Sequence, residues 1–270
     1  MSDYASTQGL LAELDDTGVL RVTLDRPAQR NSMVDTMGLA FIDHLVAAGQ
    51  DERVRVVLLG SSGDDFCAGS DLTAKNAPTG TRPRVGSIQR RLPSTMHRLI
   101  QLLLETQVPV VAAVRGWAAG LGFHMAMASD FCFASKTARF WEPFIARGFT
   151  PDSGATWLLP RLVGLTRARQ LLMLGREISG IEAAEYNLIH AAVEDGEVQA
   201  EAEALARQLA SAPTTAVGLT KWLLANSTDT PLEAQLRNEA FALELSSRSE
   251  DFREGLAAFR EKRDPEFKGR

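Results

Sequence analysis

The spacing of hydrophobic residues divides the chain into an alternating first part and a helical last part. Residues Val19 to Asp25 alternate apolar and polar side chains for most of their length, which predicts a half-buried strand. Short β-branched runs at Val54 to Leu59 and Val108 to Val114 predict two buried strands. Apolar residues at helical spacing follow Asp35, which we expect to be the N-cap of a helix. A second helix is predicted from Leu92 to Leu104. Strands that alternate with helices predict an α/β fold with largely parallel pairing.

The pattern changes near residue 195, beyond which every long element is predicted to be helical. Thr230 and Ser249 are suitable N-caps for two of these helices. We therefore expect an α/β core over residues 1–195 and a helical region over residues 196–270. The four helices are predicted over residues 198–211, 213–225, 231–247 and 249–262.

Composition and charge narrow the class of protein. The 270-residue chain has 29 Lys and Arg against 34 Asp and Glu, and this net charge of -5 argues against a general nucleic-acid binder. Its two cysteines, Cys67 and Cys132, are too few for a disulfide framework and lack the spacing of metal ligands. No apolar run reaches the roughly 18 residues of a membrane span, and no secretory signal is visible at the N-terminus. We expect a cytoplasmic globular protein.

One segment departs from this acidic balance. Between Leu72 and Leu104 there is no Asp or Glu, so the segment is locally basic. This pattern indicates either a solvated surface or a small anion site, and composition does not choose between them. The basic residues are Lys75, Arg82, Arg84, Arg90, Arg91 and Arg98.

Two glycine-bearing turns follow predicted strands, at residues 66–72 and 115–122. Turns that lead into helices offer free backbone N–H groups at positive dipole ends. A pair of such groups stabilises an oxyanion. The alternative is that these are ordinary turn glycines.

Taken together, five segments resemble the crotonase family, also called the enoyl-CoA hydratase/isomerase superfamily, over nearly the whole chain. The resemblance implies a spiral of ββα units and a helical C-terminal region that forms a homotrimer or a dimer of trimers. It also implies an acyl-CoA thioester substrate, with coenzyme A as part of the substrate and no metal or redox cofactor. The segments are Leu24 to Pro27 with Arg30 to Met33, Phe66 to Leu72, Pro109 to Gly122, Thr150 to Gly154 with Leu159 to Gly164, and Ser249 to Arg270.

The resemblance also assigns positions in the site. It implies that the backbone N–H groups of Ser70 and Leu121 form the oxyanion hole, with Leu121 in place of the glycine common in the family. The basic segment would then border the coenzyme A site, so Arg82, Arg84, Arg90 and Arg91 are either phosphate ligands or solvent-facing. The remaining substrate contacts implied by the resemblance are Ala68, Asp71, Leu72, Thr73, Gly120 and Phe144.

The hydratases of this family use two glutamates, and both are missing here. Their positions match His124 and Phe144. His124 is either an acid or base or a half-buried histidine bonded to a backbone carbonyl. Glu142 would share the face of Phe144 if the segment is extended, which leaves it as a substitute acid.

The acid that remains in a motif is Asp152. One interpretation is an N-cap of the helix that follows. The other comes from Pro151-Asp152-Ser153-Gly154, which looks like the ring 1,2-epoxyphenylacetyl-CoA isomerase group of the family, where the Asp is the acid/base. The histidines His44, His97 and His190 match no motif and are expected to be structural or exposed.

We therefore expect an enzyme that isomerises an enoyl-, ring-epoxide or aryl-acetyl-CoA thioester through a stabilised enolate, because one carboxylate is sufficient for that reaction. Hydration of an enoyl-CoA is the first alternative. Hydrolysis of a β-diketone with His124 and Asp152 stays open, and dehalogenation is disfavoured because Phe144 offers no N–H. The alternative from another class is a catalytically silent acyl-CoA-binding protein.

Overall fold

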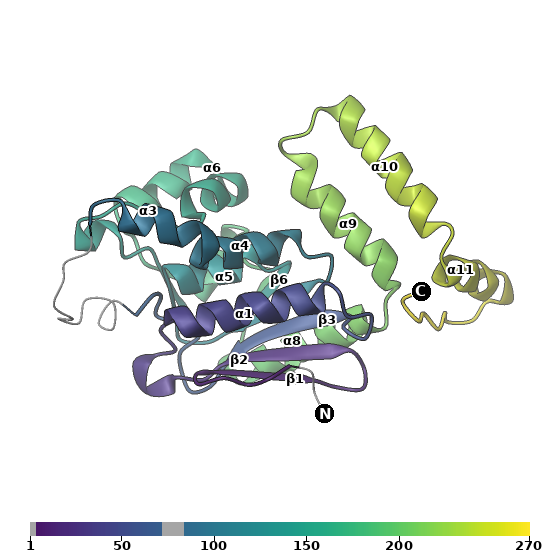
Figure 1. Ribbon diagram of the computed structural model, residues 1–270, viewed down its shortest axis with the longest axis horizontal. Helices are drawn as coiled ribbons and strands as arrows, with labels where there is room; N and C mark the ends of the chain where they lie inside the picture. Colours follow the sequence, from purple (N-terminus) through teal and green to yellow (C-terminus); the bar gives the residue numbers. More distant parts are fainter. Residues whose placement is uncertain (1–3, 72–83) are drawn as a thin grey trace.

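The computed structural model describes residues 4–71 and 84–270, and these form two sheets with helices packed around them (Figure 1). The larger sheet has the order β1-β2-β3-β4-β6-β9, and the smaller one has the order β5-β7-β8. Only β1 is antiparallel in the larger sheet. The strands are β1 (Leu10–Leu14), β2 (Val19–Leu24), β3 (Val56–Ser61), β4 (Val110–Val114), β5 (Trp117–Ala119), β6 (Phe131–Ser135), β7 (Arg139–Trp141), β8 (Ile178–Ser179) and β9 (Ala191–Val193).

Ten α-helices lie within the described ranges. Helix α6 is interrupted at Gly164, whose backbone (φ 72°, ψ 165°) is not helical. The helices are α1 (Asp35–Ala48), α3 (Ser87–Arg91), α4 (Met96–Glu105), α5 (Leu121–Ala128), α6 (Ala155–Met173), α7 (Gly180–Glu185), α8 (Val198–Ala210), α9 (Thr214–Ser227), α10 (Leu232–Ser246) and α11 (Glu250–Glu261).

The larger sheet is covered on both faces, which explains why its central strands are apolar at nearly every position. Val57 and Leu59 of β3 belong to the core that includes Phe41 of α1 and Leu99 of α4. The alternate residues of β3 belong to a second core with the small side chains of α8. The two cores pack against opposite faces of the strands from whose ends the glycine-bearing turns begin. The members on the α8 side include Val56, Leu58, Val198, Ala202 and Ala206.

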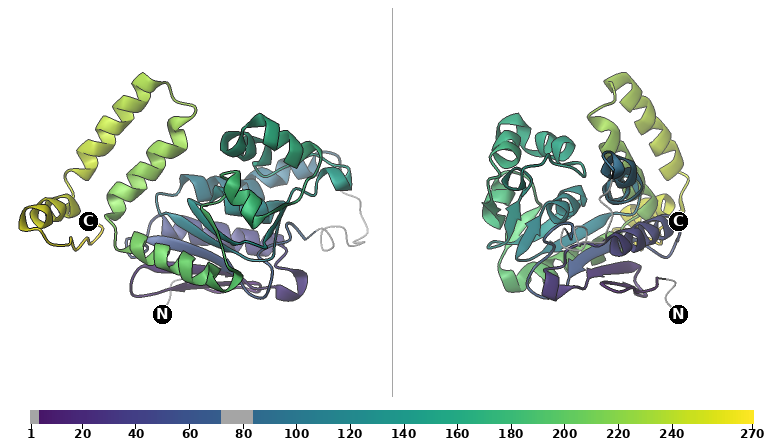
Figure 2. Two further views of the ribbon diagram at one scale, coloured as in Figure 1. Left: turned by 180° about the vertical axis from the view of Figure 1, so that it is seen from behind. Right: turned by 60° about the vertical axis from the view of Figure 1, so that its left-hand side comes forward.

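Helices α9 and α10 form an antiparallel pair that rises from the core, and α11 follows at the far end (Figures 1 and 2). Helix α9 is anchored to the core by Lys221, whose Nζ donates to the carbonyl oxygens of Leu103 (2.8 Å) and Val108 (3.2 Å) and to the Asp130 carboxylate (2.6 Å). None of the described helices is long and apolar enough to cross a membrane.

The expected α/β class, the parallel pairing and the C-terminal helices are confirmed. Three details of the helix ends were wrong. Val34, not Asp35, is the N-cap of α1, and Pro231, not Thr230, is the N-cap of α10. The helix predicted from Leu92 begins only at Met96, because Pro93 lies in a separate 3-10 turn. Ser249 does cap α11, accepting a hydrogen bond from the Phe252 N–H.

Candidate active site

The first turn of the site is held by the segment that follows β2. The fully buried side-chain amide of Asn31 donates to the carbonyl oxygens of Ser62 (2.8 Å) and Asp65 (2.7 Å). Its oxygen accepts the backbone N–H of Arg26 (2.7 Å). Asn31 has φ 53°, a left-handed conformation that asparagine tolerates better than most residues. The early strand-turn signature is therefore a scaffold for the loop after β3.

An isolated parallel β-bridge between Met33 and Ser70 fixes the orientation of the Ser70 peptide. The Met33 N–H donates to the Gly69 carbonyl (2.8 Å), and the Asp71 N–H donates to the Met33 carbonyl (2.9 Å). The Arg26 guanidinium pairs with the Asp71 carboxylate at 3.1 Å. The intervening N–H of Ser70 has no acceptor within the described residues. Ser70 therefore presents a free donor on a fixed backbone.

The second turn is joined to the first by a backbone bridge. The Cys67 N–H donates to the Trp117 carbonyl (2.8 Å), and the Ala119 N–H donates to the Cys67 carbonyl (2.9 Å). This contact needs glycine at Gly122, where a Cβ would stand 2.3 Å from the Cys67 carbonyl oxygen. Gly69 has φ 94°, and a Cβ there would lie 2.9 Å from the Ala119 carbonyl oxygen. The two glycine-bearing turns predicted from the sequence are thus in direct contact.

Leu121 supplies a second free amide beside the first turn. It is the first residue of α5, after the N-cap Gly120, and its N–H has no acceptor within residues 4–71 and 84–270. The position of a Cβ on Gly69 is 3.9 Å from the Leu121 nitrogen. The unusual backbone (φ 50°, ψ −117°) belongs to Gly120, while Leu121 is helical. Leucine is therefore compatible with this position, and its amide lies at the positive end of the helix dipole.

His124 and Glu142 form a buried pair one turn further along α5. The Nε2 atom of His124 lies 3.0 Å and 3.2 Å from the two carboxylate oxygens of Glu142. The side chains are 0% and 1% exposed, and Nδ1 of His124 is buried with no partner in the described chain. His124 is thus fully buried on a carboxylate, which corrects the half-buried interpretation with a backbone carbonyl.

Phe144 covers this pair. Its ring is stacked on the ring of His124, with 5.9 Å between centroids and 3° between planes. The tip of the Phe144 ring lies 3.8 Å from where a Cβ on Gly120 would be. The rings of Phe149 and Phe144 pack edge-on, with 5.3 Å between their centroids. Phe149 lies three residues before Asp152 in the chain. The two positions that the sequence resemblance matches to the hydratase glutamates therefore carry a stacked imidazole and phenyl ring.

Asp152 is half-buried and precedes α6, but it does not cap that helix. The N-cap is Gly154, and the cap has no side-chain hydrogen bond. The Asp152 carboxylate has no hydrogen bond or ion pair within the described ranges, and only its backbone carbonyl accepts, from the Ala155 N–H (3.1 Å). The N-cap interpretation was wrong, because positive φ values at Ser153 and Gly154 turn the chain before the helix starts.

Other expected site residues have mixed outcomes. Ala68 lies in the first turn, with its N–H donated to the Arg30 carbonyl (2.9 Å). Arg84 and Arg90 are exposed, and Arg91 pairs with Asp35 at 3.2 Å. Leu72, Thr73, Lys75 and Arg82 lie outside the described residues.

Neither a cysteine nucleophile nor a metal cluster is found in the described part of the chain. Burial raises the pKa of the Cys67 thiol to about 12, so the thiolate is not available near neutral pH. No group of three or more His, Cys, Asp and Glu side chains within the described ranges is placed to hold a metal ion.

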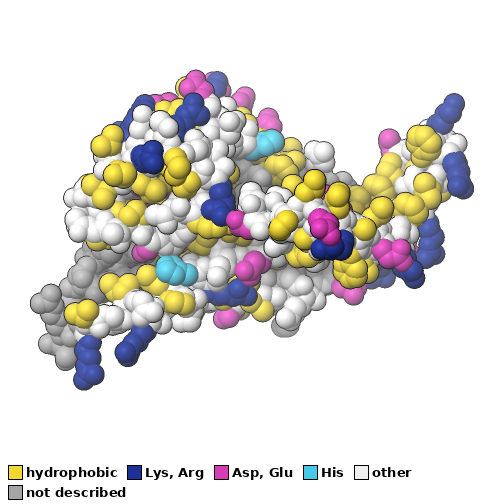
Figure 3. Space-filling view, turned by 90° about the horizontal axis from the view of Figure 1, so that it is seen from above, with side chains coloured by type: hydrophobic (Ala, Val, Ile, Leu, Met, Phe, Trp, Pro, Cys, Tyr) yellow, Lys and Arg dark blue, Asp and Glu magenta, His cyan; other side chains and the backbone are white. Residues whose placement is uncertain are grey.

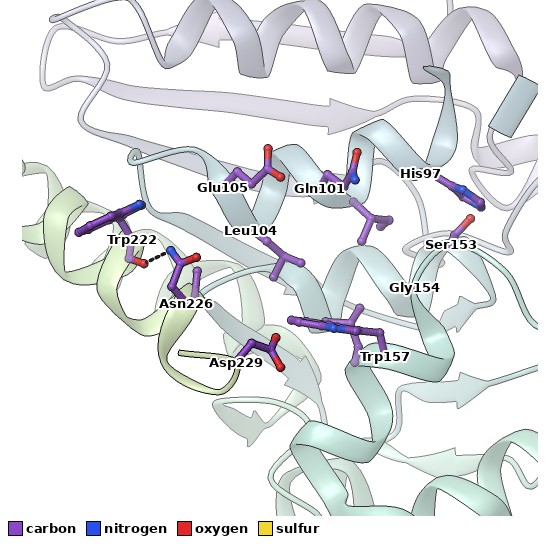
Figure 4. A pocket seen from close by; sticks show the side chains of 13 residues that line it. His97, Gln101, Leu104, Glu105, Ser153, Gly154, Trp157, Trp222, Asn226 and Asp229 are labelled. Atoms are coloured by element: carbon purple, nitrogen blue, oxygen red, sulfur yellow. Dashed lines mark hydrogen bonds between the residues drawn. The ribbon is translucent and has the colours of Figure 1, made fainter. Parts of the chain in front are cut away.

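A cavity of about 610 Å³ lies between α4, the start of α6 and α9 (Figure 4). Ser153 and Gly154, which directly follow Asp152, form part of its wall. Trp157 lies on the α6 side and Trp222 on the α9 side. His97 also lines it, although no sequence motif marked this residue.

Comparison with known proteins identifies the family of this chain. Residues 15–270 match the model of the enoyl-CoA hydratase/isomerase family. The chain belongs to this family, the crotonases.

Among its relatives is the 1,2-epoxyphenylacetyl-CoA isomerase of Escherichia coli, 38% identical over 94% of this chain and 97% of the relative. The 2,3-dehydroadipyl-CoA hydratase of the same organism is 31% identical over 93% and 96%. The crystal structure of an enoyl-CoA hydratase from Bacillus anthracis superposes with a TM-score of 0.90, at 31% identity, over 97% of this chain and all of the other.

Proposed function

We propose that this crotonase is an isomerase of enoyl-CoA or related ring-epoxide and aryl-acetyl-CoA thioesters, with Asp152 as its base. Relatives of the chain include both an isomerase and hydratases, so the choice rests on the site. The observation that carries it is the stacked His124 and Phe144 pair at the positions of the two hydratase glutamates.

In this proposal the Ser70 and Leu121 amides bind the thioester oxygen. Both N–H groups lack a protein acceptor in the described chain and are brought together by the bridge between the two turns. When a proton leaves the acyl chain, the electron pair moves onto this oxygen, and two fixed donors stabilise the resulting enolate. The loss of one such donor typically costs about 10²–10³ in rate.

Asp152 then moves a single proton. For a 3-enoyl thioester, the carboxylate takes a proton from the carbon next to the carbonyl, which gives a dienolate and a protonated Asp152. The acid returns the proton to the γ carbon while the electrons on oxygen reform the carbonyl. The double bond shifts by one position, no atom is gained or lost, and Asp152 ends as it began.

The carboxylate nearest to the missing glutamates does not support hydration. Glu142 is buried and holds His124 through both of its oxygens. We assign a positioning role to this pair, because it ties α5, which begins with Leu121, to the segment that carries Phe144. Phe144 itself cannot hold or activate a water molecule.

The test compares the wild-type protein with Asp152→Asn on 2-enoyl- and 3-enoyl-CoA panels, using product analysis. We expect the wild type to interconvert the isomers and the variant to lose about 10²–10⁴ in kcat. Asp16→Asn, at an exposed position, is the matched control and should be active.

Two outcomes favour the alternatives. Formation of the 3-hydroxy product from 2-enoyl-CoA at equal rates in both proteins would establish a hydratase. Tight binding of the thioesters with no turnover in either protein would establish an acyl-CoA-binding module, which the absence of both hydratase glutamates also permits.

We further propose that the protein is a homotrimer or a dimer of trimers. Large apolar side chains on the outer helices support this, with Phe241 61% and Phe259 84% exposed. In the space-filling view, hydrophobic side chains extend over the projecting arm (Figure 3). Such surface is unusual on a monomer and is typical of obligate interfaces.

A further inference from the structure

The cavity beside Asp152 has polar side chains at both ends. Figure 4 shows His97 and Ser153 close to each other at one end, and Trp222 and Asn226 at the other. Because Ser153 follows Asp152 in the chain, the end of the cavity with His97 adjoins the proposed base. A cavity of about 610 Å³ is within the usual range for small-molecule sites.

The middle of the cavity is suited to a carbon skeleton. Ile100 and Leu104 of α4 and Leu158 of α6 supply aliphatic surface. Trp157 and Trp222 supply aromatic surface on two different helices. An acyl chain or a ring would bury apolar area against all of these side chains.

The charges around the cavity disfavour an acyl group with a negative end. Glu105 and Asp229 both line it, and no Lys or Arg is present among its described lining residues. The two carboxylates are paired on the exposed side, Glu105 with Arg98 at 2.9 Å and Asp229 with Arg161 at 3.1 Å. A terminal carboxylate on a substrate would therefore meet two carboxylates whose arginine partners are already engaged, and no cationic side chain among the described lining residues would pair with it.

His97 supplies the specific feature of the cavity. Its Nε2 atom is buried and has no hydrogen-bond partner in the described part of the chain. Ser153 is 3% exposed and lies close by, with no hydrogen bond between the two side chains. A buried polar atom that lacks a partner costs free energy unless a ligand satisfies it.

We propose that His97 determines specificity by binding an oxygen substituent on an uncharged acyl group held in this cavity. The substrate class is thus an acyl-CoA whose acyl part carries a hydroxyl, ether, epoxide or carbonyl oxygen and no terminal charge. This inference rests on the proposed acyl-CoA function and adds the acyl end, which the family relationship leaves open.

The test measures binding, because binding does not depend on turnover. Three saturated acyl-CoAs of equal chain length are titrated by calorimetry: one unsubstituted, one with a hydroxyl group in the distal half of the acyl chain, and one with a terminal carboxylate. The wild type should bind the hydroxylated thioester roughly three- to tenfold more tightly than the unsubstituted one. The carboxylated thioester should bind most weakly.

The variants separate the hydrogen bond from packing. His97→Phe keeps a ring of similar size and should bind both uncharged thioesters equally, with the affinity for the unsubstituted one unchanged. His97→Gln, which places an amide near the position of Nε2, should retain most of the preference. Ser153→Ala removes the neighbouring hydroxyl without altering His97, and its affinities for the same thioesters are measured as a second readout.

Each further result has one meaning. An equal preference in the wild type and His97→Phe would overturn the inference and leave the proposed function intact. The same holds if the wild type binds the carboxylated thioester best. If no thioester in the panel binds to the wild type, the proposed function itself fails, and the inference fails with it.

Discussion

At the scale of single residues, the site depends on which backbone groups are left unpaired. Asn31 forms hydrogen bonds with backbone groups around the first turn, including the Arg26 N–H. Met33 forms backbone hydrogen bonds with the residues on either side of Ser70. Among the residues that the structure describes, the N–H groups of Ser70 and Leu121 in these two turns are left without an acceptor. A main-chain donor is indifferent to its side chain, so leucine at position 121 is compatible with an oxyanion hole.

Leu121→Pro tests this donor directly. Proline lacks the N–H but is tolerated at the first position of a helix, which is where Leu121 lies in α5. We expect kcat to fall by about 10²–10³ while the protein stays folded. Leu121→Met, which keeps both the N–H and the volume, is the control for steady-state kinetics and thermal unfolding. Equal rates in the two variants would refute the role of this amide.

Cys67 gives a prediction about pH. Burial raises the pKa of the Cys67 thiol to about 12, whereas the pKa of a thiol in the unfolded chain is about 8.5. The folded state therefore holds the proton over this interval, and this contribution to stability is lost as the pH rises above about 8.5. Thiol labelling of the native protein between pH 7 and 9 should occur only at the rate of unfolding. Fast labelling that follows thiolate formation would show that Cys67 is accessible.

At the scale of elements, two side-chain pairs join segments that are distant in the chain, one fully buried and one with its carboxylate 23% exposed. The pair of His124 and Glu142 links α5 to the segment after β7, and the pair of Lys221 and Asp130 links α9 to the loop before β6. Asp130 also accepts the Val110 N–H (2.7 Å), so it fixes the start of β4 as well. Both pairs hold helices that border the site or the cavity.

Lys221→Met should release α9. Desolvation holds the pKa of Lys221 below its usual value and that of Asp130 above its own, because partial burial disfavours both charges. Removing the ammonium leaves a carboxylate that is 23% exposed and two carbonyl oxygens without their donor, at a cost of about 1–3 kcal/mol. Urea unfolding measures this cost, and hydrogen exchange should locate the loss of protection in α9.

Lys262→Met is the control for this variant. Lys262 lies at the exposed end of α11, and its replacement should change the unfolding free energy by less than about 0.5 kcal/mol. If the two variants were equally stable, the anchoring role of Lys221 would be wrong.

At the scale of the whole molecule, the arm of α9, α10 and α11 carries large exposed apolar side chains, among them Leu232, Phe241 and Phe259 (Figures 2 and 3). An assembly of identical chains would cover them. Phe259→Lys combined with Phe241→Lys should therefore convert an oligomer to smaller species, as measured by light scattering coupled to size-exclusion chromatography. A wild-type protein that is monomeric at micromolar concentration would contradict the proposed assembly.

The limits of prediction from sequence also appear at this scale. The strands and C-terminal helices follow from local hydrophobic periodicity, and the two turns from glycine spacing. The pairing of His124 with Glu142 does not, because it depends on β5 lying beside β7 in the small sheet, and neither strand was predicted. His97 was missed for the same reason, since its cavity forms only where α4, α6 and α9 meet.

The central claim is that one carboxylate moves a proton within the substrate and that no water is added. The most direct measurement is mass spectrometry of the products formed from 3-enoyl- and 2-enoyl-CoA in oxygen-18 water by the wild type and Asp152→Asn. The account predicts wild-type products that are isomers of their substrates and carry no label, with turnover lower by about 10²–10⁴ in the variant. A product heavier by one molecule of labelled water, formed equally by both proteins, would contradict it.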